Sequence, residues 1–147
     1  MNEQDNNLIP ILSLAEIHYN KVYLSKNDIE QIQTIILKLN LSYIHKVLIL
    51  SAFMYDCDPN DVLEYCLEEK HDRSSIRQKS NILNARYLWM NLLVNVGDIT
   101  VKDIAKSIGI HEFKVRYYLI KFNEKNKFGT LFFDKYNAAK EVLLDIK

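Results

Sequence analysis

Residues 100–120 read TVKDIAKSIGIHEFKVRYYLI, and this stretch decides how we expect the chain to fold. Thr100 and Asp103 form a capping-box-like helix start, because the hydroxyl accepts from a free backbone N–H and the carboxylate lies near the positive helix end. Gly109 is expected to end this short helix, since a tight turn favours a residue that adopts positive φ without penalty. Between them, the apolar residues at helical spacing predict a single stripe, formed by Ile104, Ala105 and Ile108.

A second helix is expected to begin near His111 and to turn Val115, Tyr118 and Leu119 inward, with the small Ala105 allowing a close crossing. Two short helices joined by a glycine-containing turn are typical of a helix-turn-helix. The alternative is an ordinary helical hairpin in an all-α core. In the first arrangement the second helix presents these residues to solvent or to a DNA groove: His111, Glu112, Lys114, Arg116, Tyr117 and Lys121.

The composition indicates a globular all-α protein. The chain has 147 residues, of which 48% are hydrophobic, with only 3 glycines and 2 prolines. This argues against a turn-rich β fold. No apolar run is long enough to span a membrane, and the apolar residues 8–15 follow acidic rather than basic residues, unlike a secretory signal. Two cysteines, Cys57 and Cys66, then suggest inert thiols in a reducing cytoplasm.

The charges are divided along the chain. Residues 1–69 hold 4 Lys+Arg and 11 Asp+Glu, a balance of −7. Residues 70–130 hold 12 Lys+Arg and 5 Asp+Glu, a balance of +7, although the whole chain is neutral. The predicted helix-turn-helix lies in the basic block. This division favours a basic half that meets phosphate and an acidic half that serves structure or a partner.

Helical spacing and capping residues predict a compact multi-helix bundle. Helices are expected from Pro10 to about Tyr23, and then after the caps Ser25, Ser42 and Asn60. The helix after Ser42 is apolar on most sides, so we expect it at the centre of the core. Residues 70–81 are either a loop or an extension of the helix containing residues 82–93, which Gly97 would stop. A polar link after Asn123 leads to a last amphipathic helix from about residue 131.

Residues 43–146 together resemble the C-terminal DNA-binding domain of the bacterial chromosomal replication initiator, DnaA. The resemblance begins with an apolar–aspartate–valine–leucine pattern in residues 52–63. It continues in a basic loop and an "A-R-x-x-x-x-x-L" helix, matched by Ala85, Arg86 and Leu92. In the two-helix reader it is carried by Thr100, Val101, Asp103, Ile104, Gly109, His111 and Val115.

The chain also departs from that family. The family's reading helix has G-G-R-D-H-[ST]-T-V, whereas this chain has IGIHEFKV with a turn shorter by a residue. No G-x-x-x-x-G-K-[ST] motif occurs, so the chain carries no such ATPase module. The resemblance therefore implies the fold and DNA as partner, but not the family's target sequence. It implies a stand-alone relative of a kind expected in a phage, prophage or plasmid, with residues 1–42 as an acidic helical extension and residues 43–147 as the DNA-binding domain.

The leading hypothesis is a protein that binds double-stranded DNA in replication or transcription control. The groove-facing residues would be His111, Lys114, Arg116 and Tyr117. Glu112 would accept from a cytosine or simply stabilise the helix start. Arg86 would meet phosphate or pack its stem on the surface. The full set of expected phosphate contacts is Arg77, Lys79, Arg86, Lys102, Lys106 and Lys121.

Two other functions compete with DNA binding. The acidic N-terminal half could dock a replication, transcription or defence-system partner, or a second copy, through tyrosines such as Tyr19, Tyr23 and Tyr43. An enzyme is not expected, because the four histidines form no HxxxH pair and no nucleophile elbow or CxxC occurs. No cofactor is expected, and the acidic turn at residues 56–61 lacks the glycine and closing glutamate of a calcium loop.

Overall fold

The computed structural model describes residues 24–68, 76–128, 130–144 and 146, with side chains described for 24–64, 80–124, 132–144 and 146. Within these ranges the protein is an all-α bundle without strands, as predicted. The expected helix over residues 10–23 lies outside the described residues. The seven described helices are α1 (Lys26–Lys38), α2 (Tyr43–Met54), α3 (Pro59–Glu68), α4 (Ile76–Asn95), α5 (Val101–Ile108), α6 (Glu112–Phe128) and α7 (Thr130–Leu144).

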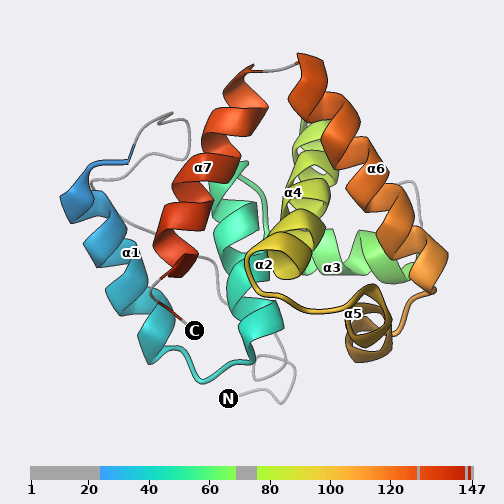
Figure 1. The fold of residues 1–147 in the computed structure, drawn as a ribbon, viewed down its shortest axis with the longest axis horizontal. Coiled ribbons are helices and arrows are strands. Elements are labelled where there is room, and N and C mark those ends of the chain that lie inside the picture. Colours follow the sequence, from blue (N-terminus) through green and yellow to red (C-terminus); the bar gives the residue numbers. More distant parts are fainter. Residues whose placement is uncertain (1–23, 69–75, 129, 145, 147) are drawn as a thin grey trace.

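Helix α2 lies at the centre of the bundle and packs most extensively against α4. Helices α1 and α7 cover one side of this pair, and α6 with α5 covers the other (Figure 1). On the first side, Gln33 of α1 donates from its side-chain amide to the backbone oxygen of Val142 in α7, 3.1 Å away. The arrangement leaves α5 and one face of α6 at the edge of the molecule, away from α1.

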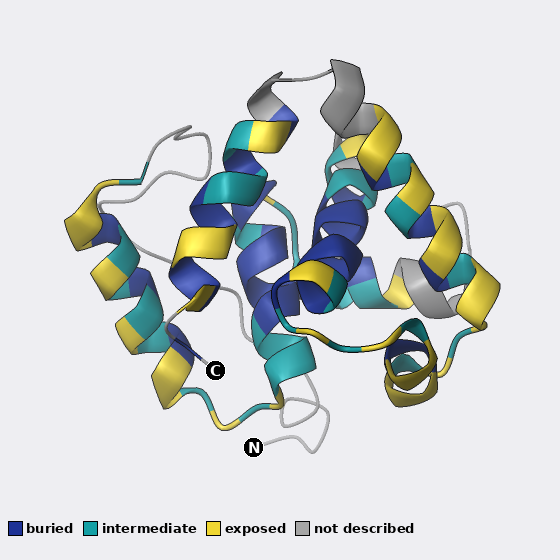
Figure 2. Cartoon of the chain, in the orientation of Figure 1, coloured by how far each residue is buried: buried dark blue, intermediate teal, exposed yellow. Residues whose placement is uncertain are grey.

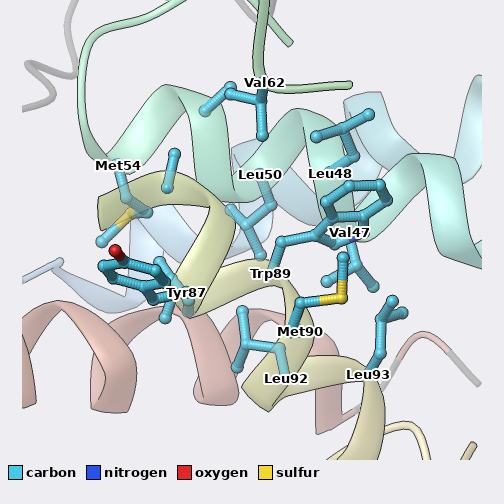
Figure 3. Packing of buried hydrophobic residues seen from close by; sticks show 14 of the residues in the cluster. Val47, Leu48, Leu50, Met54, Val62, Tyr87, Trp89, Met90, Leu92 and Leu93 are labelled. Carbon is cyan, nitrogen blue, oxygen red and sulfur yellow. The ribbon is translucent and has the colours of Figure 1, made fainter. Parts of the chain in front are cut away.

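The predicted central helix is confirmed. From Val47 to Ala52 every residue of α2 is buried, which follows from an apolar run with no polar face to direct outward (Figure 2). Trp89 and Leu92 of α4 pack into this core (Figure 3). The Trp89 indole N–H donates to the backbone oxygen of Ile44 at 2.9 Å, so its polar group is satisfied while its rings are buried.

Three predicted helix starts are also confirmed. Ser25 and Asp28 form a reciprocal capping box at α1, and the Ser42 hydroxyl accepts from the backbone N–H of His45 at α2. Thr100 accepts from the N–H of Asp103 at α5. Each cap satisfies a backbone donor that has no partner inside the helix, at a typical gain of about 1 kcal/mol.

Two sequence-based expectations were wrong in detail. Asn60 does not precede α3; the helix begins at Pro59, and the Asp58 carboxylate accepts from the N–H of Asn60 at 2.8 Å. The polar segment after Asn123 is not a link, because α6 continues to Phe128. Its Glu, Lys and Asn residues are compatible with a helix interior, and the next glycine comes only at residue 129.

Helix α4 ends at Asn95, just before the stop predicted at Gly97. Gly97 follows α4, but the residue with positive φ is Asp98, at 60°. Gly97 is needed for space instead: a Cβ there would lie 2.7 Å from Cε1 of Tyr43 and 2.8 Å from the backbone oxygen of Leu93. Aspartate tolerates the left-handed region better than most residues, so Asp98 can adopt this turn. This turn directs the chain from α4 toward α5.

Candidate nucleic-acid interface

Helices α5 and α6 are joined by a tight turn of the predicted kind. Gly109 adopts φ 85° and ψ 37°, and its N–H donates to the backbone oxygen of Ala105 at 2.8 Å. The N–H of Ile110 donates to the same oxygen at 3.0 Å. Ile104 and Ala105 are buried, as the sequence predicted. The short α5 is therefore held between the core and the start of α6.

The inward face of α6 fixes how the helix lies on the bundle. Val115, Tyr118 and Phe122 are buried at helical spacing. The Phe122 ring lies 5.0 Å from the ring of Phe132 and 5.2 Å from that of Tyr136, both in α7. These contacts tie α6 to α7, while Tyr118 faces α4. The inward face of α6 is therefore packed against both α4 and α7, which leaves its outward face exposed.

Arg86 lies inside the protein rather than at its surface. It is 5% exposed, its Nη1 donates to the Tyr118 hydroxyl at 3.2 Å, and its guanidinium carbon lies 5.0 Å from the centre of the Tyr118 ring. A guanidinium in this position cannot reach a phosphate on the surface. Both sequence-based interpretations of Arg86, phosphate contact and surface packing, are therefore replaced by a structural role between α4 and α6.

The remaining expected cations fall into three groups. Lys102 and Lys106 on α5, and Arg116 on α6, are exposed. Lys114 and Lys121 on α6 are partly exposed. Arg77 and Lys79 belong to the first turn of α4, and their side chains lie outside the described set. The structure thus brings five of the expected cations together on α5 and α6.

Lys121 is engaged in local contacts. Its ammonium lies 3.2 Å from a carboxylate oxygen of Glu124 and 5.5 Å from the centre of the Tyr117 ring. The hydrogen bond to Glu124 raises the pKa of Lys121, with further contributions from the negative charge of Glu124 and from Tyr117. An exposed pair of this kind contributes little to stability, and its main effect is to direct the lysine along the outer face of α6.

An exposed apolar stripe on α6 was missed from the sequence. Phe113, Tyr117 and Ile120 are 65%, 50% and 57% exposed. The His111 ring stacks on Phe113 with 5.6 Å between centres and 20° between planes. The spacing of the three residues, opposite to the buried Val115 and its neighbours, could have revealed the stripe. The prediction concentrated on polar groups: of the three stripe residues it named only Tyr117 as outward-facing, and it left out Phe113 and Ile120.

Other candidate sites have little support among the described residues. In that part of the chain no group of three or more His, Cys, Asp or Glu side chains could hold a metal ion. Burial, with the nearby charges of Asp61, Asp56 and Asp58, raises the pKa of the Cys57 thiol to about 12. The thiolate is the reactive form, so this supports an unreactive Cys57. Cys66 has no described side chain.

Of the tyrosines expected to bind a protein partner, Tyr43 is the one that lies among the described residues. The Tyr43 hydroxyl is buried, and burial raises the pKa of Tyr43. Its ring packs beside Gly97, and the residue is half-buried. Tyr19 and Tyr23 lie outside the described residues. Tyr43 is therefore better explained as a packing residue.

No family model, curated protein or solved structure matches this chain. Across the described ranges, no helix has the length and apolar character needed to cross a membrane.

Proposed function

We propose that this protein binds double-stranded DNA, with α5 and α6 acting as a helix-turn-helix. The observation that carries the proposal is that the outward faces of both helices hold five exposed or partly exposed cations, while their inward faces are fixed to the core. The cations are Lys102, Lys106, Lys114, Arg116 and Lys121. In helix-turn-helix proteins the second helix enters the major groove, and the first crosses the phosphate backbone.

The two helices would then have different roles. Lys102 and Lys106 of α5 would meet phosphates, which position the protein without reading sequence. Lys114, Arg116 and Tyr117 of α6 would lie in or beside the groove, with His111 at its entrance. Glu112 in the first turn of α6 would stabilise the helix start through the helix dipole.

The biological setting follows from the resemblance to the DnaA C-terminal domain. A DNA reader that resembles this domain suits replication or transcription control in a phage, prophage or plasmid. The absence of the family's reading residues implies a target different from that of the initiator.

Salt dependence provides a direct test. About five phosphate contacts give a slope of log K against log salt of about −4 to −5 for B-form DNA. We expect retention of a random duplex pool at about 50 mM salt and progressive release as salt rises. No duplex binding at that salt, or binding that salt does not affect, would contradict the proposal.

Charge reversal localises the interface. The double variant Lys114→Glu with Arg116→Glu should lose duplex retention, because repulsion replaces attraction beside the groove. The matched control reverses Lys26 and Lys38, two exposed lysines of α1, and changes the net charge equally. Equal losses in both double variants would mean that overall charge, rather than α6, governs binding.

The second function is a protein-interaction module that acts through the acidic N-terminal half. One described feature favours it: Leu37 of α1 is 54% exposed on a helix that also exposes Glu30. The same charge-reversal variant discriminates between the two functions. It should leave capture of a protein partner intact if that partner binds α1, whether or not DNA retention is lost.

A further inference from the structure

The outward face of α6 is apolar along its centre and basic along its edges. At about 100° per residue, and measured from the buried Val115, the stripe residues Phe113, Tyr117 and Ile120 lie at about 160°, 200° and 140°. Arg116 lies at about 100° on one side, and Lys121 and Lys114 at about 240° and 260° on the other. The apolar stripe of α6 therefore has one cation, Arg116, on one side and two, Lys114 and Lys121, on the other.

This cross-section matches the major groove of a duplex. The groove is about 12 Å wide and admits an α-helix, with a row of phosphates along each border. Cations on both sides of α6 suit those phosphates, whereas the line between them would face the edges of the bases. Side chains on that line would be expected to read the bases, yet Phe113 and Ile120 offer no hydrogen-bonding group.

The base edges present a single kind of apolar group in the major groove, the C5 methyl of thymine. We infer that Phe113 and Ile120, with the ring of Tyr117, select duplexes by packing against thymine methyl groups. The inference rests on the proposed DNA binding by α6 and adds what the helix reads. The His111 ring, stacked on Phe113, would help to hold the Phe113 ring outward.

The length of the stripe sets the size of the sequence that it reads. From Phe113 to Ile120 the helix rises about 10 Å, which equals about three base-pair steps. Glu124 lies on the same face one turn further along and is exposed. A carboxylate is repelled by the phosphates, so the read segment should end before Glu124. Thymines at two or three neighbouring base pairs are therefore the expected target.

Removing the methyl groups from the DNA tests this directly. We would measure binding of the full chain to a short A·T-rich duplex and to the same duplex with deoxyuridine in place of every thymine. Burial of a methyl group contributes about a fourfold change in affinity, so two buried methyls give roughly 15-fold weaker binding to the uracil duplex. Conversely, 5-methylcytosine in place of cytosine should strengthen binding to a G·C duplex, because it adds a methyl at the equivalent edge position.

Variants connect the methyl effect to α6. Phe113→Ala with Ile120→Ala should bind the thymine duplex as weakly as the uracil duplex and should lose the difference between them. Both side chains are exposed, so the fold should tolerate the change. The matched control is Phe133→Ala with Leu37→Ala, which removes an aromatic and an aliphatic side chain of similar exposure from α7 and α1. This control should keep the full methyl effect.

The outcomes separate the inference from the function beneath it. Salt-dependent binding that is equal for thymine and uracil duplexes would overturn methyl reading and leave DNA binding in place. A methyl effect that persists in the Phe113 and Ile120 variant would also overturn methyl reading. The stripe would then be better explained by another function, such as docking into a groove on another protein. Failure to bind any duplex would remove both proposals together.

Discussion

The ammonium group of Lys135 in α7 lies 2.6 Å from the backbone oxygen of Met54, the last residue of α2. The last carbonyls of a helix have no partner inside it, and a cation there also faces the negative end of the helix dipole. The ammonium lies 5.2 Å from the centre of the Tyr55 ring, and the residue is 6% exposed. A buried lysine from one helix thus caps another, and this contact joins α7 to the centre of the core.

Burial of Lys135 should make the stability of the folded protein depend on pH. It lowers the pKa of Lys135 from its ordinary value of 10.5 in the folded protein. Just below pH 10.5, Lys135 therefore holds its proton more often in the unfolded chain than in the folded protein. As a result, the contribution of Lys135 to the unfolding free energy rises as pH rises toward 10.5. The unfolding free energy of the wild type, relative to that of Lys135→Met, should increase as pH rises toward 10.5, measured by urea denaturation at each pH. A difference that stays constant with pH would contradict this effect of burial on Lys135.

The hydrogen bond from Arg86 to the Tyr118 hydroxyl is expected to stabilise the packing of α6 against α4. Tyr118→Phe removes the hydroxyl that accepts from a charged donor, which should lower the unfolding free energy by about 1.5–3 kcal/mol. Tyr117→Phe is the matched control, since Tyr117 is 50% exposed and loss of its hydroxyl should change stability by less than about 0.5 kcal/mol. The urea concentrations at the unfolding midpoint of the two variants, compared with that of the wild type, measure the difference. Equal midpoints for both variants would mean that the buried bond contributes no net stability.

The two described glycines should respond differently to a side chain. At Gly109 a Cβ would meet nothing within 4 Å, but φ is 85°. Gly109→Ala should therefore cost about 1–2 kcal/mol through the backbone alone, and Gly109→Asn should cost less, because asparagine tolerates this region. Gly97→Ala meets the Leu93 oxygen and the Tyr43 ring, so it should cost about 1–3 kcal/mol, and asparagine should bring no relief. Thermal denaturation of the four variants tests the contrast; if asparagine relieved both sites, the steric explanation for Gly97 would be wrong.

Arg116 should contribute to DNA affinity as a phosphate contact at the groove border. Arg116→Ala is expected to weaken binding to all duplexes by a similar factor and to reduce the salt slope by about 0.9. Fluorescence anisotropy over a salt series measures both quantities. Lys38→Ala, an exposed lysine of α1, should leave the slope unchanged. A loss of affinity for only some sequences would instead assign Arg116 to a base contact.

The sequence predicted features that depend on neighbouring residues. The caps at Ser25, Ser42 and Thr100 and the turn at Gly109 each involve groups within a few positions, so their chemistry is visible in the chain. The central position of α2 followed from its apolar run. These local signals were sufficient for the all-α class and for most helix starts.

Features that join distant residues could not be predicted in this way. Arg86 stands in a basic block, and only its position opposite Tyr118, 32 residues later, shows that it is internal. Lys135 and Met54 are 81 residues apart, and no local pattern marks either as a partner. The stripe on α6 lies between these cases, because its spacing was visible but its exposure depended on which face α4 covers.

The burial of Trp89 also makes the protein convenient to study. It is the single tryptophan of the chain, it is 0% exposed, and its indole is bonded to Ile44 at the junction of α2 and α4. Its fluorescence should therefore be emitted at short wavelength in the folded state and shift to the red when the core opens. Because α5 and the outer face of α6 lie elsewhere, a ligand bound there should leave this emission unchanged. One intrinsic signal can thus report loss of the core separately from occupation of the proposed interface.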